Sequence, residues 1–104
     1  MRVYISGPIS DNAEYRDQFR RAAEVLDNRG IGYINPAEII SVMPGGNWGE
    51  YMRIAATLVE MADAITFLDG WELSTGARME RAWAQMRRLP EYDLATDSFK
   101  RRME

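Results

Sequence analysis

The sequence Ser74-Thr75-Gly76-Ala77-Arg78-Met79-Glu80 follows an apolar run, Ala64-Ile65-Thr66-Phe67-Leu68. Together they predict a strand, a glycine-containing turn and a helix that carries a carboxylate about one and a half turns in. In an open α/β sheet, ligands bind at the C-terminal ends of the strands, where loops and helix N-termini converge. Glu80 is therefore either a surface residue of an amphipathic helix or a nucleophile directed at a bound substrate.

The rest of the chain predicts strands that alternate with helices. We expect strands at 3–5, 31–34, 64–68 and 90–94, and helices at about 12–28, about 48–61 and from the turn to about 88. Such alternation indicates right-handed βαβ units and a parallel sheet. We therefore predict one domain over residues 1–104, an α/β flavodoxin-like three-layer sandwich with a four- to five-stranded parallel sheet. Residues 95–104 are expected to form a charged tail.

The residue types that are missing exclude several classes of chemistry. The 104 residues include no histidine and no cysteine, so a Ser-His-Asp triad, a thiolate nucleophile and a zinc site of the usual type are excluded. Lys100 is the only lysine, which excludes a P-loop and an internal Schiff base. Any catalysis must rest on carboxylates, hydroxyls, arginines or backbone amides.

Charge and hydropathy bear on the location and the partners. The net charge of −3 argues against nonspecific nucleic-acid binding. No apolar run approaches the roughly 20 residues of a membrane span, and no signal peptide is visible. The absence of cysteine fits a reducing compartment. We therefore expect a cytoplasmic protein that binds neither nucleic acid nor membranes.

The first strand and the loop after it supply one group of candidate site residues. Tyr4 lies in the strand, and Ser6-Gly7-Pro8-Ile9-Ser10 forms the loop. Gly7 would let the backbone approach a ligand closely, and the helix that follows would offer free N–H groups to an anion. The alternative is an ordinary turn between a strand and a helix.

A second group surrounds Glu80. Gly76 and Glu80 are four residues apart and share a helix face, so Gly76 would clear space in front of the carboxylate. Ser74 can cap the helix or bind a phosphate. We expect the helix dipole to keep Glu80 ionised, as suits a nucleophile. Asp69, at the end of the preceding strand, is a candidate acid.

Three aromatic side chains at the same rim are candidates for stacking on a planar base. Trp71 follows Gly70 in the turn, whereas Trp48 and Tyr51 open the second helix. Each could equally be a core residue or an oligomer contact.

Taken in order, these motifs resemble the nucleoside 2-deoxyribosyltransferase family. The matching segments are Tyr4-Ile5-Ser6-Gly7-Pro8-Ile9-Ser10, Asn35-Pro36, Tyr51-Met52-Arg53, Ala62-Asp63-Ala64-Ile65, Gly70-Trp71 and Ser74-x-Gly76-Ala77-Arg78-x-Glu80. They cover roughly residues 1–94 and are most similar to a short branch of the family found in phages and bacteria. The same family includes nucleoside 5'-monophosphate N-glycosidases.

The resemblance implies a retaining mechanism at the sugar. Glu80 matches the nucleophile that attacks C1' and forms a covalent glycosyl-enzyme intermediate, and Tyr4 matches a tyrosine that positions it. Ser74 falls where the monophosphate hydrolases carry serine. The implied activity is cleavage or transfer of the N-glycosidic bond of a (deoxy)nucleoside 5'-monophosphate, without metal or cofactor, by a homodimer or larger homo-oligomer.

One position departs from the family. Ala55 stands where the family has an aspartate that helps to protonate the departing base. Loss of a general acid typically costs on the order of 10²–10⁴ in rate. Either Asp69 or a neighbouring subunit substitutes, or the chain is a non-catalytic module that senses or sequesters nucleotides. A structural protein that uses its tryptophans at an interface is the third alternative.

Overall fold

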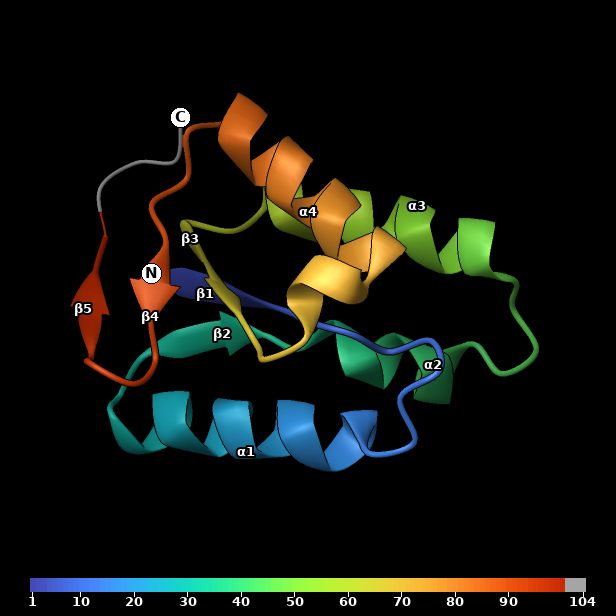
Figure 1. The fold of residues 1–104 in the computed structure, drawn as a ribbon, viewed down its shortest axis with the longest axis horizontal. Helices are drawn as coiled ribbons and strands as arrows, with labels where there is room; N and C mark the ends of the chain where they lie inside the picture. Colours follow the sequence, from blue (N-terminus) through green and yellow to red (C-terminus); the bar gives the residue numbers. More distant parts are fainter. Residues whose placement is uncertain (101–104) are drawn as a thin grey trace.

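The computed structural model describes residues 1–100, and a three-stranded parallel sheet lies at the centre of this region (Figure 1). The strands are β1 (Arg2–Ser6), β2 (Gly32–Ile34) and β3 (Ala64–Phe67), in the order β2-β1-β3. β1 occupies the middle because its apolar residues can be covered on both faces. Its residues 3–6 are all buried.

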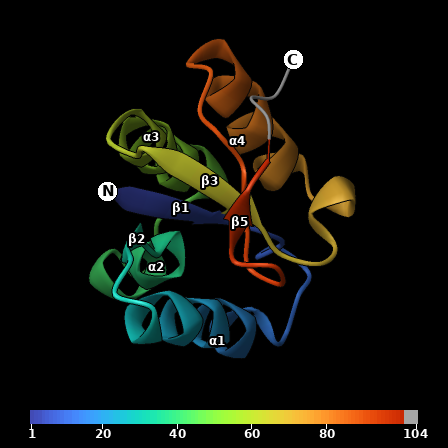
Figure 2. The same ribbon diagram turned by 90° about the vertical axis from the view of Figure 1, so that its left-hand side faces the viewer.

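Helices cover both faces of the sheet (Figures 1 and 2). α1 (Tyr15–Asn28) lies on one face, and α3 (Trp48–Glu60) and α4 (Thr75–Met86) lie side by side on the other. The segment after β2 contains a short 3₁₀ helix, η1 (Pro36–Glu38), and a single turn, α2 (Ile39–Val42). The expected helices are therefore confirmed, with ends shifted by a few residues.

The alternation of side chains along β1 divides the core in two. Val3 and Ile5 pack with Phe19 and Leu26 of α1, whereas Tyr4 faces the cluster that α3 and α4 complete. Successive side chains of a strand point to opposite faces, so residue 6 shares the face of residue 4. Two polar side chains of the central strand thus face α4.

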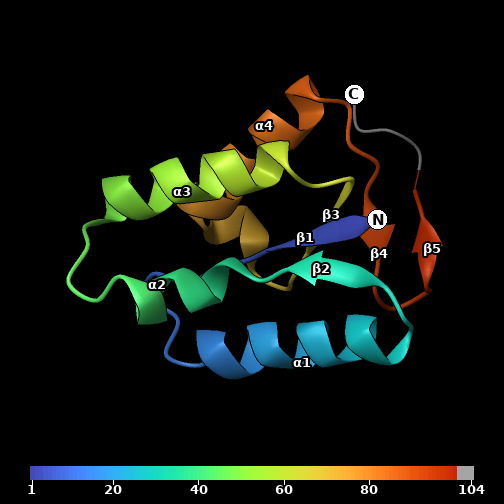
Figure 3. The same cartoon turned by 180° about the vertical axis from the view of Figure 1, so that it is seen from behind.

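The C-terminal segment differs from the expected fourth parallel strand at 90–94. Glu91 forms a single parallel bridge with Ile65, and the chain then enters an antiparallel hairpin of β4 (Tyr92–Asp93) and β5 (Ser98–Phe99) (Figure 3). Pro90 has no N–H to donate, which limits pairing at the start of the segment. Within residues 1–100 the parallel sheet therefore has three strands, not four or five.

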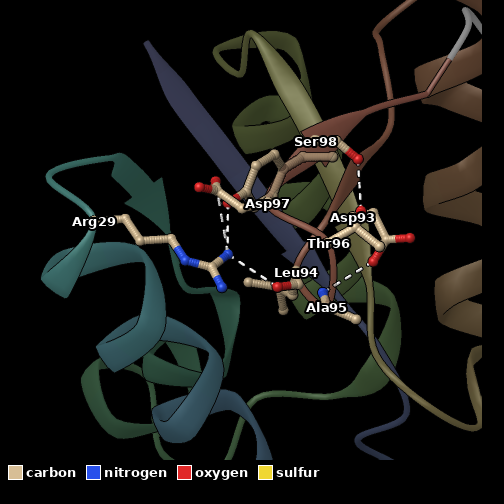
Figure 4. Close-up of polar contacts among 8 residues, drawn as sticks. Arg29, Asp93, Leu94, Ala95, Thr96, Asp97 and Ser98 are labelled. Atoms are coloured by element: carbon tan, nitrogen blue, oxygen red, sulfur yellow. Dashed lines mark hydrogen bonds and ion pairs between the residues drawn. The ribbon is translucent and has the colours of Figure 1, made fainter.

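A polar cluster fastens this hairpin to the end of α1 (Figure 4). Arg29 follows α1, and its Nη1 donates to the Tyr92 hydroxyl at 2.7 Å and to the Leu94 carbonyl at 2.9 Å. The Tyr92 hydroxyl in turn donates to Asp97 Oδ1 at 2.5 Å. The predicted charged tail at 95–104 is thus partly a structured hairpin, and its last four residues lie outside the described part of the chain.

No helix among residues 1–100 combines the length and the apolar character needed to cross a bilayer.

Candidate functional site

Glu80 lies on the inner side of α4 and is held from the central strand. Its side chain is buried, with 6% of the residue surface exposed. The Tyr4 hydroxyl donates a short hydrogen bond to Oε2, and the Ser6 hydroxyl donates to Oε1 at 2.7 Å. Both carboxylate oxygens are therefore oriented by donors on one face of β1.

The sequence of α4 explains why this helix lies so close to the sheet. Ser74 caps its N-terminus, since the Ser74 Oγ accepts a hydrogen bond from the Ala77 N–H at 3.1 Å. Ala77 and Ala84 are both buried on the inward face. These small side chains allow the close approach that brings Glu80 within reach of Tyr4 and Ser6.

Burial dominates the electrostatics of Glu80. Desolvation raises its pKa from 4.5 to about 7, although the hydrogen bonds from Tyr4 and Ser6 lower it. Burial, followed by the charge of Glu80, raises the pKa of Tyr4 well above its ordinary value. The expectation that the helix dipole keeps Glu80 ionised is therefore wrong. Glu80 lies beyond the first turn of α4, where the effect of the dipole fades. Near neutral pH the carboxyl is divided between its two protonation states.

A small apolar cavity of about 220 Å³ opens in front of Glu80. Its walls come from the β1–α1 loop, Phe19 of α1, the segment after β2, residues 48–55 of α3, and Gly76 and Glu80 of α4. Among residues 1–100, Glu80 is the only carboxylate or cationic side chain in the lining. Pockets for drug-sized ligands measure roughly 300–1,000 Å³. The cavity is therefore sized for part of a ligand, with the remainder outside.

The loop Ser6–Ser10 forms one wall of the cavity through Gly7, Ile9 and Ser10. A Cβ at Gly7 would stand 2.9 Å from the Leu68 Cβ, so only glycine allows the loop to cross the end of β3 at this distance. Pro8 does not line the cavity. Its carbonyl accepts from the Asn12 amide at 2.8 Å, which holds the loop against the start of α1.

Gly76 lies in the lining together with Glu80, as the spacing of the two residues indicated. A Cβ at Gly76 would meet the Met52 sulfur at 3.4 Å, at the boundary between α4 and α3. Alanine at this position would therefore make only ordinary van der Waals contact with Met52.

Asp69 and Trp71 lie elsewhere. They line a separate and wider hollow of about 950 Å³ between α1, the end of β3 and the hairpin. The Trp71 ring packs on Phe67 with centroids 4.9 Å apart, and the Arg81 guanidinium lies over it at 5.5 Å. Neither residue is part of the cavity of Glu80, which separates the candidate acid and the candidate stacking ring from the candidate nucleophile.

Sequence reasoning missed most of the apolar wall. Pro36, Ile39 and Ile40 from the segment after β2 line the cavity, as does Met52 of α3. The available signal was Asn35-Pro36, which ends β2 at the same edge of the sheet as the first loop. Trp48 and Tyr51, considered only as ambiguous rim residues, are also in the lining, as is Ala55.

No group of three or more acidic side chains within residues 1–100 is arranged to hold a metal ion.

Residues 1–91 match the model of a protein family described as a domain of unknown function, DUF4406. No curated protein and no solved structure matches the chain. The matched region runs from β1 to the bridge at Glu91 and includes every residue that lines the cavity.

Proposed function

Since the chain belongs to the DUF4406 family, whose description states no activity, we propose a function from the site itself. The protein cleaves or transfers the N-glycosidic bond of a (deoxy)nucleoside 5'-monophosphate through a covalent intermediate on Glu80. One observation carries this proposal: a buried carboxylate at an apolar cavity has both oxygens oriented by hydroxyl donors. Such a group is suited to attack on an anomeric carbon.

The reaction would proceed in two displacements. A Glu80 oxygen attacks C1', the C1'–N bond breaks, and its electron pair leaves with the base. The carboxylate stabilises the oxocarbenium-like transition state. Water, or a ring nitrogen of an acceptor base, then attacks C1' and releases Glu80. Tyr4 and Ser6 restrict the side chain to one orientation throughout, which reduces the entropy cost of each attack.

The position of the cavity supports a nucleotide as the ligand. Trp48 and Tyr51 offer aromatic surface for a base on the cavity side. Ser74 uses its Oγ lone pair at the N-terminus of α4, so its hydroxyl proton stays available to a phosphate oxygen near that helix end. The phosphate would lie outside the cavity, which is too small for a whole nucleotide.

The arrangement of the sheet is compatible with the proposed family resemblance. Flavodoxin-like domains have the strand order 2-1-3-4-5, and β2-β1-β3 corresponds to its first three members. We include a flavodoxin-like three-layer fold and a homodimer or larger homo-oligomer in the proposal. Leu73 and Met86, which are 92% and 82% exposed, give α4 and its approach an apolar surface that a second copy could cover.

Base release tests the proposal directly. The purified protein is incubated with a panel of nucleoside and 2'-deoxynucleoside 5'-monophosphates, and free base is measured by chromatography. Glu80→Gln should abolish release. Glu72→Gln is the matched control because it makes the same chemical change at an exposed glutamate outside the cavity. Equal release by Glu80→Gln and the native protein would overturn the proposal.

A binding module is the second candidate, and Ala55 favours it. Ala55 lines the cavity at 4% exposure and supplies no proton for a departing base. In this case Glu80 would grip a ribose hydroxyl, and nucleotides would raise the melting temperature without any release of base.

A further inference from the structure

We infer that the ring cleaved from the sugar is a cation, attached through a positively charged nitrogen as in a pyridinium ribonucleotide or an N7-alkylated purine nucleotide. This inference rests on the proposed function of Glu80. It names the class of leaving group that a site of this chemistry can release.

Apart from Glu80, which must be ionised to attack, nothing among the described residues of the lining would protonate a neutral base. Ile39, Ile40, Met52 and Ala55 form an apolar wall, and within residues 1–100 no carboxylate or cationic side chain other than Glu80 lines the cavity. The Tyr51 hydroxyl is the one phenol in the lining, and it donates to the Met43 carbonyl at 2.9 Å. Its proton is therefore committed to the backbone.

The charge of the leaving group decides whether the lack of a proton donor slows the reaction. A neutral base departs with the electron pair of the C1'–N bond as an anion, and it needs a proton to leave quickly. A cationic ring takes the same pair and departs neutral, with no proton transferred. Water then attacks C1', its extra proton passes to solvent, and Glu80 is restored. A site with one nucleophile and no acid therefore suits the second kind of substrate.

The cavity also offers recognition for a positive ring. Glu80 forms no ion pair among the described residues, so a bound cation would be its only close counter-charge. A positive charge bound next to Glu80 would favour the ionised carboxylate that the attack requires. Trp48 and Tyr51 add aromatic faces, which attract cations in partly desolvated sites.

A matched substrate pair tests the inference kinetically. 7-Methylguanosine 5'-monophosphate and guanosine 5'-monophosphate share the sugar and the purine, and they differ in the methyl group and the ring charge. After subtraction of uncatalysed hydrolysis, we expect kcat/KM for the methylated compound to be larger by on the order of 10²-fold or more, the scale of a missing general acid. Nicotinamide mononucleotide should be cleaved as well. Equal rates on the pair, or faster release of guanine, would overturn the inference while leaving the proposed function intact.

Residue 55 links this preference to the missing acid. Ala55→Asp should lower the ratio of kcat/KM for 7-methylguanosine 5'-monophosphate to kcat/KM for guanosine 5'-monophosphate. The aspartate supplies a proton donor that only the neutral base needs. Ala55→Asn has nearly the same size but no acidic proton, and it should leave the ratio wide. Equal narrowing by both variants would show that cavity shape, not proton supply, sets the preference, and would overturn the inference.

Binding without turnover separates the two proposals. Quenching of tryptophan fluorescence compares 1-methylnicotinamide, a cation, with neutral nicotinamide. We expect tighter binding of the cation by roughly 10-fold, and loss of this preference in Glu80→Gln. Cation preference with no release from any substrate would refute the catalytic function but retain the selectivity of the cavity. If the protein neither prefers the cation nor releases base, both the proposed function and the cationic leaving group are refuted.

Discussion

Two buried tyrosines each donate a hydrogen bond to a carboxylate, and they belong to the two different core clusters of the molecule. Tyr4, fully buried in β1, bonds to Glu80, whereas Tyr92, 1% exposed in β4, bonds to Asp97. Asp97 has 58% of its side chain exposed and lies 3.8 Å from the Arg29 guanidinium. Glu80 is only 6% exposed and forms no ion pair with any residue of the described region 1–100.

The difference shows what makes a carboxyl group reactive. Beside Tyr92, water and Arg29 satisfy the charge of Asp97, and the cluster serves to fasten a hairpin. Beside Tyr4, the donors compensate burial only in part, and the pKa of Glu80 rises to about 7. The same pair of residue types is thus structural where charge is satisfied and poised for chemistry where it is not.

Exchange of each carboxylate for its amide should give the largest difference in activity between the two sites. Glu80→Gln removes the nucleophile, so we expect kcat/KM for base release to fall by on the order of 10³-fold or more. Asp97→Asn changes a partly exposed residue of the hairpin and should leave kcat/KM within about 2-fold. Similar activity of the two variants would contradict the distinction between the two sites.

Titration of Glu80 should make the free energy of unfolding depend on pH. Its pKa in the folded protein, about 7, exceeds its ordinary value of 4.5, so the folded state binds more protons between these values. Stability should therefore decrease as the pH rises through this window, by about 3 kcal/mol relative to Glu80→Gln. Urea unfolding of both proteins from pH 4 to pH 8 measures this difference. Parallel stability curves would show that Glu80 titrates normally.

Removal of a single hydrogen-bond donor should change both the pKa and the reactivity of Glu80. The Tyr4 and Ser6 hydrogen bonds lower its pKa, so Tyr4→Phe should move the acidic limb of the pH profile of kcat/KM above pH 7. A hydrogen bond to a charged group contributes about 1.5–3 kcal/mol, which corresponds to a decrease of roughly 10- to 100-fold in kcat/KM at neutral pH. Ser6→Ala should shift the limb in the same direction. If kcat/KM falls but the acidic limb of its pH profile does not move, Tyr4 contributes packing and does not set the pKa of Glu80.

The hairpin cluster should show the smallest effect. Tyr92→Phe keeps the packing of the ring but removes the hydrogen bonds with Arg29 and Asp97. We expect a loss of about 1 kcal/mol in the free energy of unfolding, since both former partners can be rehydrated. Activity should be unchanged, and calorimetry together with the base-release assay measures both. A loss of activity as large as that of Tyr4→Phe would show that the hairpin contributes to the function of the Glu80 site.

The order of elements could be predicted because it depends on local patterns. Apolar runs and helical spacing located β1, α1, α3, β3 and α4 to within a few residues of their observed ends. The shared face of Tyr4 and Ser6 follows from strand alternation alone. The pKa of Glu80 could not be predicted in this way, because burial depends on how α4 packs against the sheet.

The misplaced candidates fail for a related reason. Gly70 adopts φ 90°, a left-handed conformation that glycine permits, and the chain turns there before Trp71 reaches Phe67. Sequence proximity to β3 places Asp69 at the correct end of the strand but does not determine which side of the sheet edge it faces. The apolar wall at Ile39 and Ile40 belongs to a segment with little regular structure, where patterns carry little information.

The hydrogen bond from Tyr4 to Glu80 joins residues that are 76 positions apart, which has a consequence for the order of folding. β1 precedes β2 and β3 in the chain, yet it is the centre of the sheet and must wait for β3 before both of its edges are paired. Contacts of long sequence separation form late, because their loop-closure entropy is offset only by neighbouring native contacts. In a refolding chain, the return of activity would therefore report closure of the whole domain, after the helices have already formed.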